Sequence, residues 1–221
     1  MKHCPQCSTG YPDTLTACPT HGLPLNEIRD IEPGMVVHRS YRLEHVDRNE
    51  FKHAGQVYDL KHLRPYTTSF ERPAKGNRLA EKFSVNVTFS HHCFTRGLPR
   101  DGSAYDLTLR FDREGDRRIF DAGRWELSKL LPGIIAKLPT SRCYQSGYGN
   151  FFTIELVAGD GSKIEYEVYF RVWKPGRGRI FLHVESAYIR EEDYGRSKPK
   201  GRSIDFYVIL HNTLNKRAIH S

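Results

Sequence analysis

Long apolar runs are absent from this 221-residue chain, and cysteine is scarce outside one short segment. No run approaches the roughly 20 apolar residues of a membrane-spanning helix, so we expect no membrane partner. Of the 5 cysteines, three fall within the first 18 residues, which argues against a secreted scaffold held by disulfides. Because the sequence opens directly on this cysteine-bearing segment, we expect no secretory leader. These absences predict a protein of the cytoplasm.

Two short pairs of metal-ligating residues stand at the start of the chain. Cys4-x2-Cys7 and Cys18-x2-His21 are separated by ten residues. Each pair aims two side chains at one point, and two such pairs close the tetrahedron that Zn²⁺ prefers. Four protein ligands leave no open position, so we predict one structural zinc ion. His3 is an alternative fourth ligand, and free or disulfide-bonded cysteines are the alternative to a metal.

The segments that carry these pairs resemble a known module. "KHCPQC…YPD…CPTHGLPL" resembles the zinc ribbons at the N-termini of some bacterial serine/threonine kinases, and "PGMVVHRSYRLEHV" resembles the entry strand of such a kinase. The chain then departs from the kinase pattern, because "DRNEF" follows Val46 where a glycine-rich loop belongs, and V-A-I-K, H-R-D and D-F-G are missing. The resemblance therefore implies a ribbon attached to a different domain.

Charge is distributed unevenly along the chain. Residues 1–56 hold 6 Lys/Arg and 7 Asp/Glu, whereas residues 57–221 hold 28 and 19. We therefore divide the chain into a zinc ribbon (1–26), a connector with short strands (27–56) and a basic α+β domain (57–221). A basic domain attracts polyanions, and RNA is the partner we expect. The alternative is that the positive charge serves solubility alone.

The residue pattern of the basic domain predicts a mainly antiparallel sheet packed against one helix, in the α+β class. Residues 120–138 carry an apolar stripe with helical spacing; Asp121 is placed to cap this helix, and Pro132 to kink it or begin a second one. Alternating apolar residues predict strands. These strands are 82–94, 104–111, 150–157, 163–173, 179–190 and 203–212, the last four forming an antiparallel meander.

One face of this meander carries polar side chains with catalytic potential. The period of two places Arg171, His183 and Glu185 on one face, together with Asp205 and Tyr207 of the last strand. A general acid, a general base and an arginine are what metal-independent RNA cleavage by 2′-hydroxyl attack requires. We predict that His183 and Glu185 are the acid and base and that Arg171 neutralises the phosphate. The alternative is an ordinary solvated sheet face.

The predicted helix and four-stranded meander, residues 120–211, resemble in topology the barnase/RelE-like ribonucleases, a group of small toxins and phage-borne nucleases. No diagnostic motif supports this resemblance. It implies that Ser186, Tyr188 and Arg190 are further candidates for an active site. Their strand phase places them on the apolar side, so we rank them below His183 and Glu185.

Two basic loops are candidates for binding nucleic acid, with flexible solvated loops as the alternative. They contribute Lys174, Arg177 and Arg179 from "KPGRGR" and Arg196, Lys198, Lys200 and Arg202 from "GRSKPKGR". In "SHHCFTRG", we expect His91 and His92 to be hydrogen-bonded at a strand end rather than to bind metal, because neighbours on a strand point to opposite faces. Cys93 and Cys143 are expected to be buried thiols.

The sequence therefore predicts a cytoplasmic zinc-ribbon protein whose basic domain binds RNA and cleaves it by acid–base chemistry. The alternative is a non-enzymatic module with a structural zinc ion. In that case, the ribbon and the sheet would dock a partner protein or a nucleoprotein surface.

Overall fold

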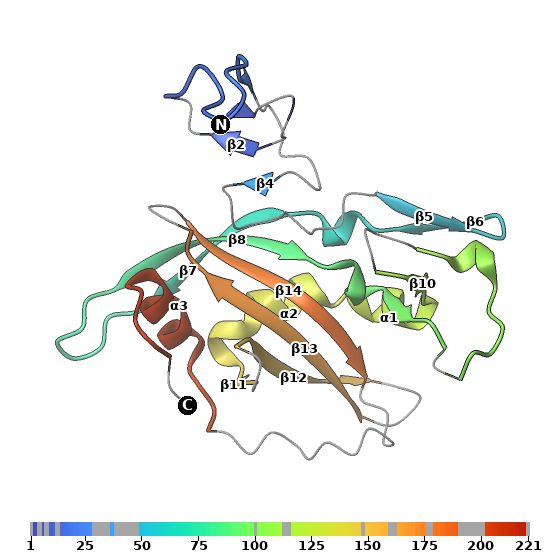
Figure 1. Cartoon of the computed structure of the whole chain (residues 1–221). Coiled ribbons are helices and arrows are strands. Elements are labelled where there is room, and N and C mark those ends of the chain that lie inside the picture. The colour runs from blue at the N-terminus through green and yellow to red at the C-terminus, as the bar shows by residue number, and fades with distance from the viewer. Residues whose placement is uncertain are drawn as a thin grey trace. The chain divides into compact units, whose positions relative to one another are not determined.

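The computed structural model divides the chain into two compact units, Met1–Asp47 and Arg48–Ser221 (Figure 1). The described residues are 2–3, 6, 9–11, 14–27, 36–37, 49–99, 101–111, 116–146, 149–158, 163–175, 179–189 and 202–219. In the first unit, four short strands form a sheet in the order β3-β1-β2-β4. They are β1 (Lys2–His3), β2 (Thr9–Tyr11), β3 (Asn26–Glu27) and β4 (Val36–Val37).

A six-stranded sheet organises the second unit, in the order β11-β12-β13-β14-β8-β7. The strands are β7 (Tyr66–Arg72), β8 (Glu81–Phe89), β11 (Cys143–Gln145), β12 (Phe151–Ala158), β13 (Lys163–Trp173) and β14 (Ile180–Ile189). All neighbours are antiparallel except β14 and β8, which are parallel. The expected α+β class with a mainly antiparallel sheet is therefore confirmed.

The predicted helix over 120–138 is confirmed, as two short helices. α1 (Ala122–Ser128) begins after Asp121, whose side chain accepts the backbone N–H of Arg124. α2 (Leu131–Lys137) has Pro132 in its first turn, where a missing N–H costs nothing, and the 3₁₀ turn η4 (Leu138–Thr140) follows it. Pro132 thus begins a second helix, one of the two outcomes expected for it.

The predicted fourth meander strand, 203–212, is wrong: the segment forms the helix α3 (Phe206–Leu214). Asp205 precedes the helix, and its side chain accepts the backbone N–H groups of Tyr207 and Val208, which is the geometry of an N-cap. The buried residues Phe206, Ile209 and Leu210 are spaced three and four apart, as on one face of a helix. The alternation that predicted a strand was therefore coincidental.

Residues 104–111 were also predicted as a strand, and this too is wrong. They contain the 3₁₀ turn η3 (Leu107–Leu109), where Asp106 accepts the N–H of Thr108. The remaining elements are β5 (Glu50–His53), β6 (Gln56–Asp59), η1 (Lys61–Leu63), η2 (His91–Cys93), β9 (Thr95–Gly97) and β10 (Arg118–Phe120). β5 pairs with β6 in the second unit, although its residues fall within the range assigned to the connector.

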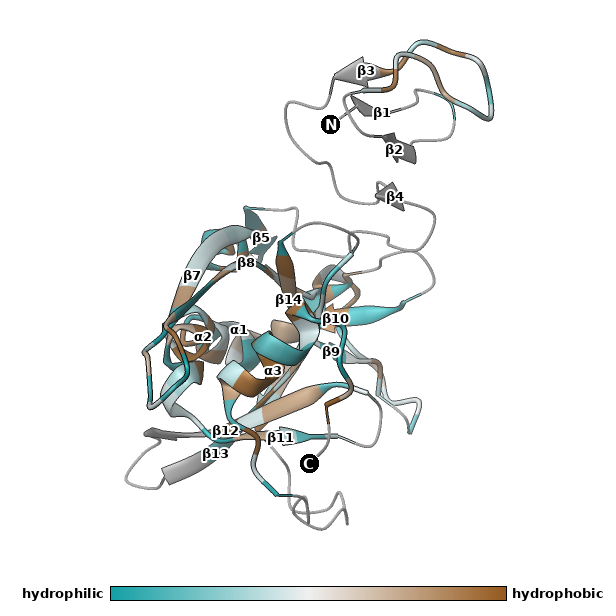
Figure 2. Ribbon diagram, turned by 90° about the vertical axis from the view of Figure 1, so that its left-hand side faces the viewer, coloured by the Kyte–Doolittle hydropathy of each residue, from teal (hydrophilic) through white to brown (hydrophobic). Residues whose placement is uncertain are grey.

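The core of the second unit lies inside the curve of the sheet. Figure 2 shows α2 and α3 on this inner side. Phe206 of α3 stands 5.0 Å from Phe70 and 6.4 Å from Phe170, measured between ring centroids. Cys93 and Cys143 are fully buried, as expected. Among the described residues, we find no helix with the length and apolar character that a membrane crossing requires.

Candidate functional site

The sheet brings the three predicted catalytic residues together on one face. Arg171 of β13 is the direct register partner of His183 on β14, so the two side chains leave the same face. This is the face opposite α3, because the adjacent residue Phe170 points toward Phe206. We call it the outer face.

Each of the three side chains is held by a specific partner. Arg171 Nη2 lies 2.9 Å from Glu185 Oε1, in an ion pair whose arginine side chain is 54% exposed and whose glutamate side chain is 27% exposed. Asn150 Nδ2 donates to the other carboxylate oxygen of Glu185. The Nδ1 atom of His183 is 2.8 Å from Thr88 Oγ1 on β8. Asn150 and Thr88 had no signal in the sequence, because their roles depend on strand order.

A β-bulge corrects the expected phase of the end of β14. The register shifts between Tyr169 and Phe170, and beyond this point Ser186 pairs with Tyr169 and Tyr188 with Glu167. Ser186 and Tyr188 therefore lie on the outer face, and the expectation that they fall on the apolar side is wrong. An extra residue in a strand reverses the alternation that follows it, and Glu185 occupies that place. Arg190 lies outside the described residues.

Aromatic rings flank the Arg171–His183 pair on both sides along the strands. Trp173 and Phe181 form the next register pair on the outer face toward one end, with their ring centroids stacked at 5.6 Å. Toward the other end, Tyr169 stacks on Tyr188 at 5.6 Å. Burial raises the pKa of Tyr169, so its phenol stays neutral and its hydroxyl donates to Glu167. The outer face thus alternates between rings and a charged or polar pair.

Asp205 and Tyr207 are not part of this face, contrary to the sequence prediction. Both residues belong to the start of α3, since Asp205 caps the helix and the Tyr207 hydroxyl donates to the backbone carbonyl of Glu71. They were assigned to the polar face because residues 203–212 were predicted to form a strand, and that prediction is wrong.

Three of the seven predicted nucleic-acid-binding residues are described by the structure. Lys174 Nζ donates to the backbone carbonyl of Leu214 at 3.2 Å, which satisfies an acceptor at the C-terminus of α3. Its ammonium group thus has a structural contact. Arg179 and Arg202 are exposed. The other four residues lie outside the described part of the chain: Arg177, Arg196, Lys198 and Lys200.

Two of the four predicted zinc ligands are described, and they face each other. Cys18 is 2% exposed, and its Sγ atom lies 3.6 Å from His21 Nδ1. The turn closes with Gly22, whose N–H donates to the Cys18 carbonyl and whose φ of +66° favours glycine. Cys4 and Cys7 lie outside the described residues.

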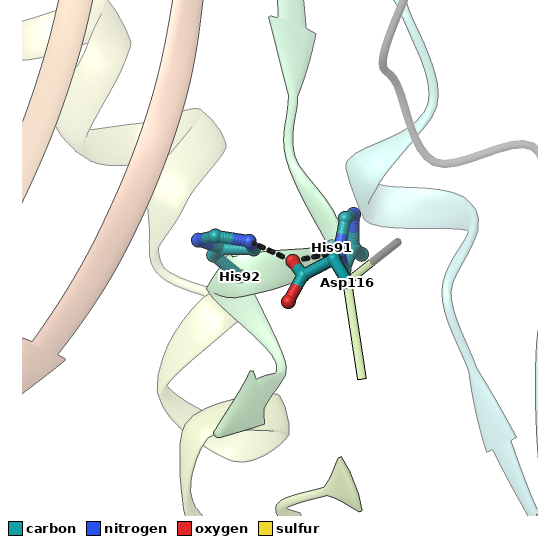
Figure 3. A group of neighbouring side chains, drawn as sticks. All are labelled: His91, His92 and Asp116. Atoms are coloured by element: carbon teal, nitrogen blue, oxygen red, sulfur yellow. Dashed lines mark hydrogen bonds and ion pairs between the residues drawn. The ribbon is translucent and has the colours of Figure 1, made fainter. Parts of the chain in front are cut away.

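A further polar cluster combines His91, His92 and Asp116, here called the triad (Figure 3). The Nε2 atoms of His91 and His92 lie 3.0 and 2.6 Å from the same oxygen, Asp116 Oδ2. The expectation that both histidines are hydrogen-bonded is confirmed. The reason given for excluding a shared ligand is wrong, because the two residues occupy a 3₁₀ turn rather than a strand.

Burial keeps the triad imidazoles neutral. It lowers the pKa of His91 to about 4 and also lowers that of His92. Partial burial of Asp116 opposes ionisation, but hydrogen bonds from His92 and His91 outweigh it and lower the pKa of the carboxyl group. Ser90 is the one sequence signal for this turn: its hydroxyl accepts the N–H of His92, a capping contact that ends the strand. Asp116, far along the chain, had none.

Comparison with known proteins matches the second unit. The YjaZ family model covers residues 50–214, which run from β5 to the end of α3 and contain both the outer face and the triad. The protein YjaZ of Escherichia coli strain K12 is 30% identical over 166 residues, which are 75% of this chain and 89% of that protein. No solved structure matches the chain. On the strength of the family match, the chain belongs to the YjaZ family.

Proposed function

We propose that the second unit binds RNA on the outer face of its sheet and cleaves it by acid–base catalysis. The observation that carries this proposal is the adjacency of Arg171, His183 and Glu185. Register places Arg171 opposite His183, and an ion pair of 2.9 Å joins Arg171 to Glu185. The Arg171 guanidinium is thereby placed beside both side chains that transfer protons in the proposed reaction, His183 and Glu185.

The proposed reaction needs no metal ion or cofactor. The Glu185 carboxylate takes the proton of the ribose 2′-hydroxyl, and the resulting 2′-oxygen attacks the adjacent phosphorus. The bond from phosphorus to the 5′-oxygen breaks, and protonated His183 gives its proton to that oxygen, leaving a 2′,3′-cyclic phosphate. Arg171 stabilises the charge that develops on the phosphate oxygens. Thr88 and Asn150 orient His183 and Glu185.

The aromatic rings supply the stacking contacts that binding of single-stranded RNA requires. Bases of single-stranded RNA stack on exposed or half-exposed rings, and each such stack contributes about 1 to 3 kcal/mol. Trp173 and Phe181 are half-buried and lie next to Arg171 and His183 along the strands. A base seated on this pair would bring its phosphate to Arg171.

The first prediction concerns RNA binding. Arg171→Gln is expected to weaken binding of a single-stranded RNA oligonucleotide, and to flatten the plot of log affinity against log salt by about 0.7 for one lost phosphate contact. Fluorescence anisotropy over a salt series measures both effects. Lys52→Gln is the matched control, because it removes the same charge from an exposed Lys–Glu pair on β5, outside the six-stranded sheet.

Equal salt slopes for wild type and Arg171→Gln would remove Arg171 from the interface. If the wild-type protein shows no affinity for RNA at low salt, the proposal fails. The protein is then better explained as a non-enzymatic module that docks a protein or nucleoprotein partner.

We also propose that Cys4, Cys7, Cys18 and His21 hold one structural zinc ion in a ribbon. Support comes from the approach of Cys18 to His21 and from the matched spacing of the two ligand pairs. Thiolate ligands require a reducing environment, and we therefore place the protein in the cytoplasm.

The second prediction follows from this ribbon. Cys18→Ser is expected to lose the tightly held zinc equivalent that remains in wild-type protein after dialysis, because a closed site depends on each of its ligands. Elemental analysis of the dialysed protein measures the zinc content. Cys143→Ala, which changes a buried cysteine of the second unit, should retain the zinc. A wild-type protein without zinc would contradict the ribbon assignment.

A further inference from the structure

We propose that the triad of His91, His92 and Asp116 is a binding site for a first-row divalent transition-metal ion, separate from the ribbon and from the outer face. This site is open: three protein ligands hold the ion, and water or a small anion completes its coordination. The proposal does not depend on RNA binding or cleavage.

The local backbone explains how two consecutive histidines reach one point. β8 ends at Phe89, and the Ser90 hydroxyl accepts the N–H of His92 to start the turn η2. Successive side chains on a 3₁₀ helix are separated by about 120°, compared with 180° on a strand. Both imidazoles can therefore point to the same side, where Asp116 enters just before β10.

The three ligand atoms converge closely enough to share an ion. All lie within 4.8 Å of one another, and each Nε2 is within 3.0 Å of Asp116 Oδ2. With metal–ligand bonds of about 2.0 to 2.2 Å, neighbouring ligands on one ion stand about 3 to 3.5 Å apart. Small rotations of His92 and Asp116, whose side chains are 35% and 39% exposed, make room for the ion.

The donor set selects the class of metal. Imidazole nitrogen favours ions of the iron-to-zinc series, whereas calcium and magnesium prefer sites built from oxygen alone. Two histidines and one carboxylate with open positions form the arrangement typical of a catalytic or exchangeable site rather than a closed structural one. The triad thus differs in kind from the thiolate-rich ribbon.

Two features near the triad limit its affinity. Arg118 Nη1 lies 3.9 Å from Asp116 Oδ1, so a cation already faces the second carboxylate oxygen. The buried Nδ1 atom of His91 has no hydrogen-bond partner among the described residues, although metal-bound histidines ordinarily donate from this position. Each feature weakens binding, and we expect a dissociation constant on the order of micromolar rather than nanomolar.

Cobalt titration of the full-length protein as purified tests the proposal. Wild-type protein is expected to bind one Co²⁺ without the thiolate-to-cobalt charge-transfer band that a ribbon site produces. Asp116→Asn and His92→Ala should each weaken this binding at least about tenfold. Cys143→Ala, which leaves all four ribbon ligands in place, should leave it unchanged. Asp106→Asn is the matched control, because its carboxylate pairs with a single histidine among the described residues, His53, at 2.9 Å.

A second measurement covers the case in which the triad variants fail to fold. In wild-type protein labelled with ¹⁵N-histidine, substoichiometric Co²⁺ should broaden the imidazole signals of His91 and His92 before those of the other histidines among the 11. Uniform broadening would indicate adventitious surface binding and overturn the proposal. So would cobalt affinity that is the same in wild type and in a folded Asp116→Asn variant.

Discussion

His183→Ala is expected to lower the rate of RNA cleavage by at least about a hundredfold, because the leaving 5′-oxygen then has no positioned proton donor. Glu185→Gln should cause a loss of similar size, since an amide cannot accept the proton of the 2′-hydroxyl. The measurement is the initial rate of cleavage of a single-stranded RNA in the presence of EDTA. EDTA excludes contaminating metal-dependent nucleases and keeps the triad free of metal.

The two variants also separate chemistry from binding. In Glu185→Gln, Arg171 loses its anionic partner at 2.9 Å, so RNA affinity should be unchanged or higher while cleavage falls. His211→Ala serves as the matched control, because His211 is likewise half-buried and held through its Nδ1 atom, which lies 2.9 Å from Glu81 Oε1, but it belongs to α3. Cleavage that persists in both His183→Ala and Glu185→Gln would contradict the assignment. Cleavage that occurs without EDTA but is abolished when EDTA is added would move the chemistry to a metal site.

The sequence alone predicted those features of the outer-face site that depend on the alternation within one strand. The period of two placed His183 beside Glu185, and it placed Arg171 on the same side of its own strand. Which strand lies beside which is not encoded in that period, so Thr88, from the parallel neighbour β8, had no signal. The bulge between Tyr169 and Phe170 is also invisible locally, because its cause is the pairing of two strands.

Helix–strand ambiguity accounts for the largest error in the fold. The segment from Ile204 to Leu210 is rich in β-branched and aromatic residues, which favour strands. The competing signal was Asp205, a good N-cap before apolar residues at helical spacing. Packing against Phe70 and Phe170 decides between the two, and such tertiary contacts override intrinsic propensity. The resemblance to the barnase/RelE-like topology depended on a fourth meander strand at residues 203–212, which is the helix α3.

Two truncations in α3 should differ sharply in their effect on stability. Phe206→Ala is expected to lower the free energy of unfolding by about 3 to 5 kcal/mol, because it removes a ring that is 1% exposed and leaves a cavity between α3 and the sheet. Val208→Ala should change it by less than about 1 kcal/mol, because Val208 is only half-buried and alanine is the better helix former. Urea unfolding monitored by circular dichroism measures both values.

The comparison is decisive because helix and strand predict different partners for Phe206. On a strand, Phe206 and Val208 would share the buried face, so both truncations would be costly. On the helix, the next buried position after Phe206 is Ile209. Ile209→Ala should therefore lower the free energy of unfolding by about 2 to 5 kcal/mol. If Phe206→Ala does not fold, Phe206→Leu keeps most of the side-chain volume and provides a measurable, smaller loss. A loss at Val208 that exceeds the loss at Ile209 would show that residues 203–212 form a strand.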